Sequence, residues 1–448
     1  MIRSLFTRRG AAAVAAASIG LTGMSLAFAG AAGAAPSASL IVGSGSQTSY
    51  AVMTALSNVF DNAAGCNLDG TTGSIPATLN CGTSTFAPGA VGGEQGFNVS
   101  SENPYNDFTV QAPAIGSGNG RTALLASGSG SPTQQIDYAR SSSYSAVGST
   151  VNFVKYATDG VSWTTFNHYK GVATAQSAIS NISTTDLKLI MNDTLSCVKA
   201  GVTVKMNWEC LGATKSAHID CYMAQTGSGT YNTWSGYLGF SGNPACVKDN
   251  TNGDTTGAKH SALSENEMAT IYGQSDAKYA IYFMSLGKYT TTCPGGVSGT
   301  SSKGVCAGTS TTTYTTLGKI DGIVAKQSTV QGTGGGAGVT FPVTRGLYNV
   351  YNNSTAIVPS SQATLNFTSE YGFLCKASAT DIDPSTGVSF RTDIENAIKA
   401  QGFFPLDVTI GHTFPEGTVA NPAVLTDAGY TAIDPTVPTN GYCLLSHG

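Results

Sequence analysis

The chain has 448 residues, of which 41% are hydrophobic and only 11% charged, and it contains 55 glycines. This length allows one large domain or two to three ordinary ones. The low charge and the abundant Gly, Ser and Thr are typical of an extracellular globular protein with polar loops. The formal net charge is −4, so the basic footprint that a nucleic-acid-binding protein needs is missing and that function class is excluded.

Residues 1–34 predict a secretory signal peptide. The basic stretch MIRSLFTRRG precedes the apolar run AAAVAAASIGLTGMSLAFAG, and AAGAAPSAS offers an Ala-x-Ala site with cleavage after Ala34. A retained membrane anchor is the alternative, because the run is nearly long enough to span a bilayer. Cleavage removes Arg3, Arg8 and Arg9 and leaves 19 basic against 26 acidic residues, a balance of −7. We expect an exported protein, periplasmic or extracellular, that is soluble after cleavage.

The mature chain begins with a strand, a turn and a helix. Leu40, Ile41 and Val42 predict a short buried strand, and the turn Gly43–Thr48 follows. One helix face then carries apolar residues at positions i, i+4, i+7 and i+8, namely Val52, Leu56, Val59 and Phe60. Two more Gly/Ser-rich turns, Gly116–Gly120 and Gly227–Thr230, also stand between an extended stretch and a helix.

The rest of the chain alternates strand and helix patterns. VNFVKYATDGVSWTTFNH and VTFPVTRGLYNVYNN are β-rich, and SENEMATIYGQSDAKYAIYFMSLGKY indicates a helix, a loop and then a strand or a second helix. ISTTDLKLIMND begins a helix that Ser183 or Thr184 caps. The Gly/Ser/Thr-rich composition of residues 65–104 and 290–340 predicts that both segments are polar surface loops. This alternation predicts an α/β fold with Gly/Ser/Thr-rich loop insertions.

Ten cysteines follow the signal segment, and none forms a CxxC pair, which disfavours a zinc site. An even number in an exported chain predicts disulfides. The sequence leaves the connectivity open, and pairing nearest neighbours is our guess. That guess gives Cys66–Cys81, Cys197–Cys210, Cys221–Cys246, Cys293–Cys306 and Cys375–Cys443.

The three turns are candidates for anion binding. A helix N-terminus exposes unpaired amides with a partial positive charge, glycine lets an anion approach the backbone, and Ser/Thr hydroxyls add donors. Taken singly, each turn is more simply an ordinary cap. The lysine of GxxxxGK[ST] is missing, so the turns are not P-loops.

The order of these segments resembles that of the phosphate-binding proteins of ABC importers, which have the type II periplasmic-binding-protein fold. The stretches that carry the resemblance are SLIVGSGSQTSY, AIGSGNGRTALL, IDYARSSS, ISTTDLKLIMND, MAQTGSGTYNTWSGYLG and FPVTRGLYNVY, which cover roughly a third of the chain. The resemblance implies two α/β lobes with a ligand cleft between them. One lobe would hold residues 37–155 with 338–448 and the other residues 156–337, with crossings near 150–160 and 335–345.

The resemblance also implies a set of ligand contacts: Gln47, Thr48, Ser117, Ser142, Ser228, Gly229 and Thr230. Two charged contacts of the family are missing, because its carboxylate falls on Ser142 and its arginine on Ala224. We expect Arg140 to balance the ligand's charge, with Arg121 and Arg345 as other candidates. A carboxylate accepts the proton that distinguishes hydrogen phosphate from sulfate, so the ligand can be phosphate, another oxyanion or a small organic acid.

We therefore predict an exported, monomeric solute-binding protein that takes a small oxyanion, phosphate first, and has an ABC importer permease as a candidate partner. A secreted or cell-surface structural protein that uses the fold without transport is the alternative. We expect no enzyme, cofactor or metal. GxSxG and HExxH are absent and the histidines are scattered, although a Ser-His-Asp triad can assemble from distant residues.

Two further features have a simple interpretation beside a functional one. Asp249–Gly257 is similar to a calcium loop, but it lacks the glutamate at the twelfth position and is better explained as a polar loop. The tryptophans Trp163, Trp208 and Trp234 can stack on a sugar ring, although packing in the core is the more ordinary role.

Overall fold

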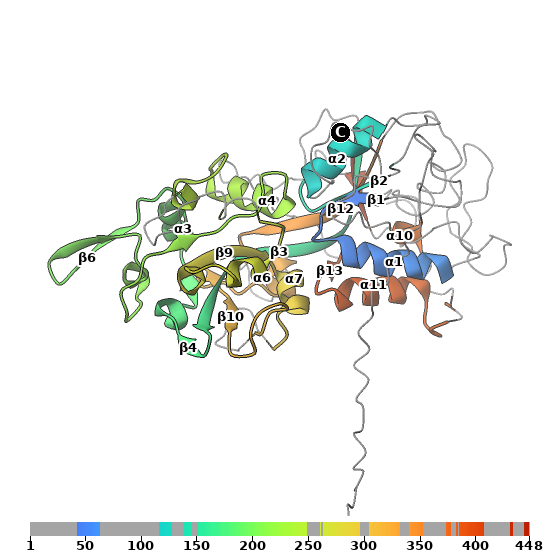
Figure 1. Ribbon diagram of the computed structural model, residues 1–448. Helices are drawn as coiled ribbons and strands as arrows, with labels where there is room; N and C mark the ends of the chain where they lie inside the picture. The colour runs from blue at the N-terminus through green and yellow to red at the C-terminus, as the bar shows by residue number, and fades with distance from the viewer. Residues whose placement is uncertain are drawn as a thin grey trace, which may run out of the picture. The chain divides into compact units, whose positions relative to one another are not determined.

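Figure 1 shows the structure, which is a computed structural model. The chain forms two units, Met1–Ala32 and Gly33–Gly448. Everything described below belongs to the second unit. The described residues are 43–62, 116–127, 136, 138–144, 151–248, 260, 263–295, 304–331, 340–352, 373–377, 382–383, 385–406, 431–432 and 443–447. The predicted signal segment, the strand at residues 40–42, the excursion 65–104, the Cys66–Cys81 bridge and the loop Asp249–Gly257 lie outside them.

One long strand, β3 (Val151–Tyr169), is common to most of the sheet. It pairs antiparallel with β12 (Thr344–Asn352) over the register Thr344↔Gly160 to Asn352↔Val151. Every β3 residue from Val151 to Asn167 is buried, because other elements cover both faces. The β-rich runs of the sequence therefore form a central antiparallel pair, as predicted.

The first half of β3 belongs to a sheet with the order β1–β2–β12–β3–β15–β14. Its members besides β3 and β12 are β1 (Gly43–Gly45), β2 (Tyr138–Ser141), β15 (Leu444–His447) and β14 (Thr431–Ala432), and the short strand β13 (Phe404–Pro405) also pairs with β3. Figure 1 shows α2 (Ser117–Ser127) on one side of this sheet, with α1 (Tyr50–Asn62), α10 (Phe373–Lys376) and α11 (Phe390–Ala400) on the other.

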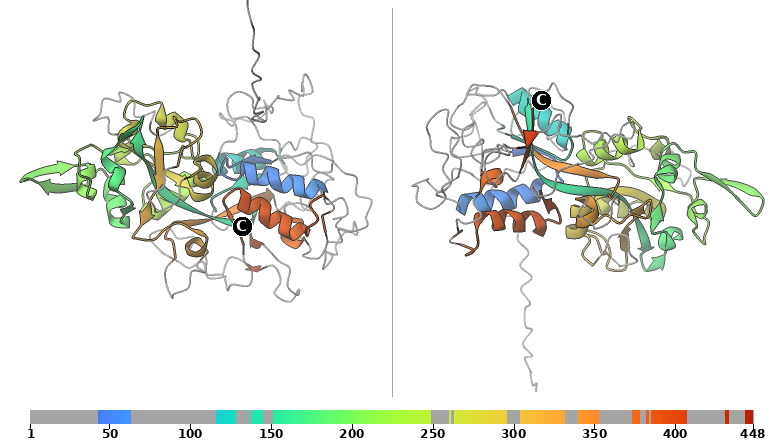
Figure 2. Two further views of the ribbon diagram at one scale, coloured as in Figure 1. Left: turned by 90° about the horizontal axis from the view of Figure 1, so that it is seen from below. Right: turned by 180° about the vertical axis from the view of Figure 1, so that it is seen from behind.

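The alternation of side chains along β3 and β12 fills a core on each face of this sheet. Val154 and Leu347 pack with α1 and α11, whereas Phe153 and Val350 pack with α2. The predicted helix face is confirmed, since Val52, Leu56 and Phe60 are buried and Val59 is partly buried. Helices α1 and α11 lie side by side in Figure 2.

The second half of β3 pairs with β4 (Val172–Ala173), β9 (Ala280–Ser285) and β10 (Tyr314–Leu317), and β9 pairs in parallel with β8 (Asp220–Cys221). The helices here are α3 (Thr184–Met191), α4 (Gly229–Leu238), α6 (Met268–Tyr272), α7 (Leu286–Thr292) and α8 (Gln327–Val330). Short 3₁₀ helices lie at Ala175–Ala178, Trp208–Leu211, Ala245–Lys248 and Ala277–Tyr279. Of the two predicted caps of α3, Ser183 is the one observed, and its side chain accepts a hydrogen bond from the Asp186 amide.

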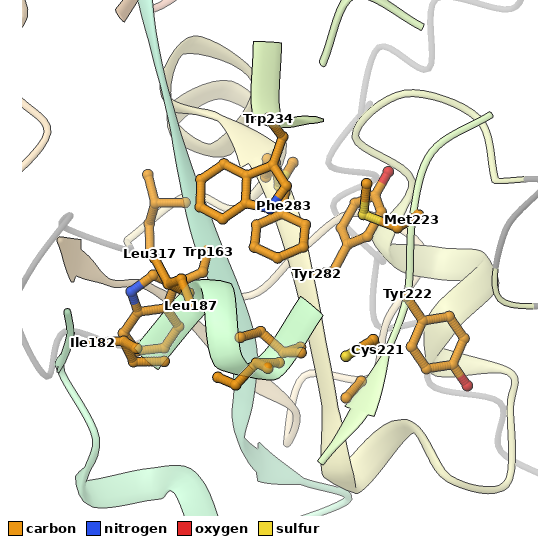
Figure 3. Close-up of a cluster of buried hydrophobic side chains, with 14 of the residues drawn as sticks. Trp163, Ile182, Leu187, Cys221, Tyr222, Met223, Trp234, Tyr282, Phe283 and Leu317 are labelled. Carbon is orange, nitrogen blue, oxygen red and sulfur yellow. The ribbon is translucent and has the colours of Figure 1, made fainter. Parts of the chain in front are cut away.

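A third core fills this half of the molecule. Trp234 stacks on Phe283 with ring centroids 3.8 Å apart, and Trp163 lies near Ile182 and Leu317 (Figure 3). All three tryptophans are fully buried, so the interpretation as sugar-stacking residues is wrong and they belong to the core.

Two small sheets complete this half. Strands β5 (Asn181–Ile182) and β11 (Lys319–Ile320) pair in parallel, and β6 (Ser196–Lys199) forms a hairpin with β7 (Val202–Lys205). The hairpin projects away from the other described elements (Figures 1 and 2).

The predicted α/β class and two-lobed arrangement are confirmed. Separate cores form on the two halves of β3, and β3 and β12 are the strands that pass between them. Two local predictions are wrong. Gly43–Gly45 is a strand because it pairs with β2, so the first turn begins only at Ser46. The excursion predicted at 290–340 contains β10, β11 and α8, because its β-branched residues complete the sheet on β3.

Four of the guessed disulfides are confirmed: Cys197–Cys210, Cys221–Cys246, Cys293–Cys306 and Cys375–Cys443. The first joins the projecting β6–β7 hairpin to a neighbouring 3₁₀ helix. The last joins α10 to the residue before β15 and closes a loop of 68 residues. It therefore ties the start of the C-terminal strand to α10.

The two bridges should differ in their contribution to stability. Loop-closure entropy predicts that Cys375→Ser/Cys443→Ser lowers the free energy of unfolding by about 4 kcal/mol, and that Cys197→Ser/Cys210→Ser, with its 13-residue separation, lowers it by about 3 kcal/mol. Urea unfolding of both double variants measures the difference. An equal or greater loss from the hairpin bridge would contradict this expectation.

Candidate functional site

The three Gly/Ser turns meet. The Gly118 amide donates to the Gly227 carbonyl at 3.0 Å, and the Gly116 amide donates to the Gly45 carbonyl at 3.2 Å. Gly116 has a φ of +88°, and a Cβ there would lie 2.5 Å from the Gly227 oxygen. This position therefore requires glycine, and the sequence pattern that predicted three separate turns produces one backbone cluster.

Buried hydroxyls line the place where the turns meet. Ser46 and Thr48 precede α1, Ser117 begins α2, Ser142 follows β2, and Ser228 caps α4. The Ser142 amide donates to Ser117 Oγ at 2.9 Å, and Ser142 Oγ lies 3.0 Å from Ser46 Oγ and 3.3 Å from Ser117 Oγ.

Gly229 lets the α4 end of this cluster come close to the others. A Cβ on Gly229 would lie 2.1 Å from Ser142 Oγ and 2.5 Å from Ser117 Oγ. Any side chain here would push the hydroxyls away, so Gly229 fixes how near α4 lies to α2 and to the end of β2.

Arg345 reaches the same place from the central strand pair. It stands opposite Asp159 in the β12–β3 register, and its Nε and Nη2 lie 2.9 Å and 2.8 Å from Asp159 Oδ2. Its Nη1 donates to Thr230 Oγ1 at 3.0 Å and to Ser142 Oγ at 3.3 Å, and Nη2 donates to Thr48 Oγ1 at 3.4 Å. Both charged side chains are buried, so a fixed cation lies among the turns.

The carboxylate of Glu265 lies at the centre of the cluster. Its Oε1 accepts from Ser228 Oγ at 2.8 Å and from the Thr230 amide at 3.2 Å. Its Oε2 accepts from Ser46 Oγ at 3.0 Å, the Thr48 amide at 3.1 Å and Thr48 Oγ1 at 2.9 Å. These donors come from the ends of two helices, and together they form the environment of an oxyanion.

Electrostatics keep this carboxylate ionised. Burial alone would raise the pKa of Glu265, but the charge of Arg345 and the hydrogen bonds from Ser228, Thr230 and Thr48 outweigh it and hold the pKa below its ordinary value of 4.5. Burial also lowers the pKa of Lys288, which the nearby charges of Glu265 and Asp159 oppose. The site therefore holds a buried anion at neutral pH.

A short loop before α6 presents Glu265. Leu263 forms an isolated parallel β-bridge with Ala224, and the Glu265 amide donates to Gln47 Oε1 at 3.2 Å. Asn266, with a φ of +62°, donates from Nδ2 to Thr48 Oγ1 at 3.0 Å and accepts at Oδ1 from the Ser285 amide at 2.8 Å. The loop is thus held on both sides of Glu265.

The predicted ligand residues gather around this carboxylate to different degrees. Thr48, Ser228 and Thr230 contact it directly, whereas Ser117 and Ser142 lie in the adjoining hydroxyl cluster. The Gln47 side chain accepts a hydrogen bond from the Glu265 backbone amide rather than contacting the carboxylate. Gly229 provides the close approach.

The three candidate arginines have different positions. Arg140 donates from Nε to the Ser46 carbonyl at 3.2 Å and lies over the Tyr50 ring at 5.2 Å. Arg121 donates to Ser141 Oγ and to the Ser143 carbonyl, each at 3.3 Å. Arg345 donates to the predicted ligand hydroxyls of Thr48, Ser142 and Thr230.

Sequence reasoning missed Glu265, Asp159 and Ser46. Pairing the two β-rich runs could have placed Asp159 opposite Arg345, but no local signal marks Glu265. In the part of the chain that the structure describes, no group of three or more His, Cys, Asp or Glu side chains can hold a metal ion. None of the described helices is long and apolar enough to cross a membrane.

No protein-family model and no curated protein matches the sequence. Three of the solved structures that are similar to this chain are phosphate-binding proteins, each with 14% sequence identity. One is a Clostridium perfringens protein assigned as a phosphate ABC transporter substrate-binding protein, with phosphate bound; the TM-score is 0.45, with 82% of this chain and 100% of that chain covered. A second is the high-affinity periplasmic protein PfluDING bound with phosphate, with a TM-score of 0.44 and 88% and 95% covered.

A third is a human phosphate-binding apolipoprotein, with a TM-score of 0.41 and 83% and 92% covered. These neighbours are of the same class as the family that the sequence resembles.

The lowered pKa of Glu265 predicts a pH-dependent contribution to stability. A carboxyl group whose pKa is lower in the folded state stabilises the protein fully above its unfolded pKa and loses that contribution as the pH falls through the folded value. Glu265→Gln should therefore be less stable than the parent at pH 7, and the gap should narrow below about pH 4.5. Urea unfolding of both proteins from pH 7 to 3 tests this, and a gap that is constant or widens on acidification would contradict it.

Arg345→Met should be strongly destabilising, because it leaves Asp159 and Glu265 buried without their cation. The expected loss in the free energy of unfolding is about 3–5 kcal/mol. Lys399→Met is the control, since Lys399 forms a largely exposed pair with Glu395 at 3.1 Å that contributes less than about 1 kcal/mol. Similar losses in the two variants would show that the buried cation has no special importance.

Proposed function

We propose that this chain is an exported solute-binding protein that binds a small oxyanion where the Glu265 carboxylate now lies. In this proposal residues 1–34 are the signal peptide, one lobe contains residues 37–155 and 338–448, and the other contains residues 156–337. Thr48, Ser117, Ser142, Ser228, Gly229 and Thr230 form the binding site. Arg345 takes the charge-balancing role first assigned to Arg140, because it contacts the hydroxyls.

The observation that carries the proposal is the donor set around one buried carboxylate. Ser46 and Thr48 precede α1, which packs in a core of the first half of β3, and Ser228 and Thr230 stand at the start of α4, which packs in the core of the second half. Amides and hydroxyls that point at two oxygens, with Arg345 behind them, recognise an oxyanion without any lysine. A ligand held from both lobes would hold them together.

Phosphate is the first ligand of the proposal. A tetrahedral anion can place two oxygens where the Glu265 oxygens lie, and its other oxygens can reach hydroxyls that Glu265 leaves unused, such as Ser117. Ser142 can donate or accept, so sulfate is the matched competitor. An ABC importer permease is the candidate partner of a monomeric receptor.

The second candidate is a secreted or cell-surface structural or interaction protein that uses this fold without transport. One observation favours it: the protein's own Glu265 carboxylate occupies these donors. A permanent internal carboxylate would join the two lobes as a structural contact.

Calorimetric titration of the signal-free protein with phosphate, and then with sulfate, tests the first candidate. We expect saturable phosphate binding, which Ser228→Ala/Thr230→Ala weakens at least about 10-fold, because the Ser228 hydroxyl is lost as a donor and a hydrogen bond to a charged group contributes about 1.5–3 kcal/mol. Ser389→Ala is the control, since it also removes an N-cap, that of α11, but lies outside the site. No heat with either anion would favour the second candidate, and unchanged affinity in the double variant would contradict the site.

A further inference from the structure

Glu265 takes the position that the proposed function gives to a free anion. We propose that Glu265 is an intramolecular ligand of its own oxyanion site, and that a free anion binds only by displacing it. This inference rests on the proposed function in treating the cluster as an anion site. It adds the competitor that sets the affinity of the site.

The first step is the completeness of the contact. Both Glu265 oxygens accept hydrogen bonds, two at Oε1 and three at Oε2, from groups on both sides of the cluster. The side chain is only 6% exposed. A second anion cannot use these donors while Glu265 holds them.

The second step is the preorganisation of the loop. Gln47 Oε1 accepts a hydrogen bond from the Glu265 backbone amide at 3.2 Å. Asn266, the next residue, donates from Nδ2 to Thr48 Oγ1 at 3.0 Å. Both contacts join the Glu265 loop to the segment before α1. A tethered carboxylate in such a loop acts at a high effective concentration, so it competes well with a free anion.

The third step is chemical. Truncation of Glu265 to alanine removes one methylene and the carboxylate, which is the size and charge of acetate. The vacated position keeps its amides, its hydroxyls and Arg345. Acetate should therefore restore what the truncation removes, and phosphate should find the donors free.

The experiment titrates acetate and phosphate, at pH 7.5, into the parent protein, Glu265→Ala and Glu265→Asp. We expect Glu265→Ala to bind both anions at least 10-fold more tightly than the parent. Acetate should also raise its melting temperature saturably, which sodium chloride at equal concentration should not do. Glu265→Asp keeps the charge but is one methylene shorter, so it should release some donors and also bind phosphate more tightly.

The matched control is Glu267→Ala. Glu267 lies two residues along the same loop, where it caps α6 through the Ala269 and Thr270 amides. We expect its anion affinities to equal those of the parent, and a gain equal to that of Glu265→Ala would overturn the proposal.

The outcomes separate this inference from the proposed function. A parent that binds no anion, beside a Glu265→Ala variant that binds acetate or phosphate, supports the internal ligand and removes the receptor function. A parent that binds phosphate as tightly as both variants overturns the internal ligand and keeps the receptor function. If Glu265→Ala does not fold, Glu265→Asp decides, and no gain in phosphate affinity overturns the proposal.

Discussion

The buried ion pair between Arg345 and Asp159 is the constraint on which the site depends. The two residues stand opposite each other on β12 and β3, and a shift of one residue in that register would turn them to opposite faces. The same register places Val154 and Leu347 in one core and Phe153 and Val350 in another. Packing of the sheet therefore also fixes a cation beside the three turns.

That cation explains why an oxyanion can be buried there. Arg345 is shared between Asp159 and the hydroxyls of Ser142, Thr48 and Thr230. All three hydroxyls accept from Arg345, and the Thr48 hydroxyl also donates to the Glu265 carboxylate. A carboxylate in this network is stabilised by charge and by hydrogen bonds together, which outweighs its loss of hydration.

The sequence predicted the parts of the site that depend on local structure. Glycine turns, the caps at Ser183 and Ser228, and the apolar face of α1 all follow from neighbours within a few residues. The charged contacts could not be predicted this way. In the family that the sequence resembles, the charged contacts fall at the positions of Ser142 and Ala224. In this chain Glu265 and Arg345 provide the charges from other elements. SENE resembles an ordinary helix start. Glu265 is 37 residues from Ser228 in the chain, and only the tertiary packing shows that it accepts a hydrogen bond from the Ser228 hydroxyl.

The arrangement of unused hydroxyls suggests how a free anion can compete with a tethered one. Glu265 has two oxygens, and the Ser117 and Ser142 hydroxyls bond to each other and to neighbours rather than to it. A tetrahedral anion has more oxygens and can recruit these groups, so it gains contacts that an internal carboxylate lacks. A planar monocarboxylate gains none of them and also lacks the tether. Selectivity between anions would then depend mainly on the hydroxyls that Glu265 does not contact, those of Ser117 and Ser142.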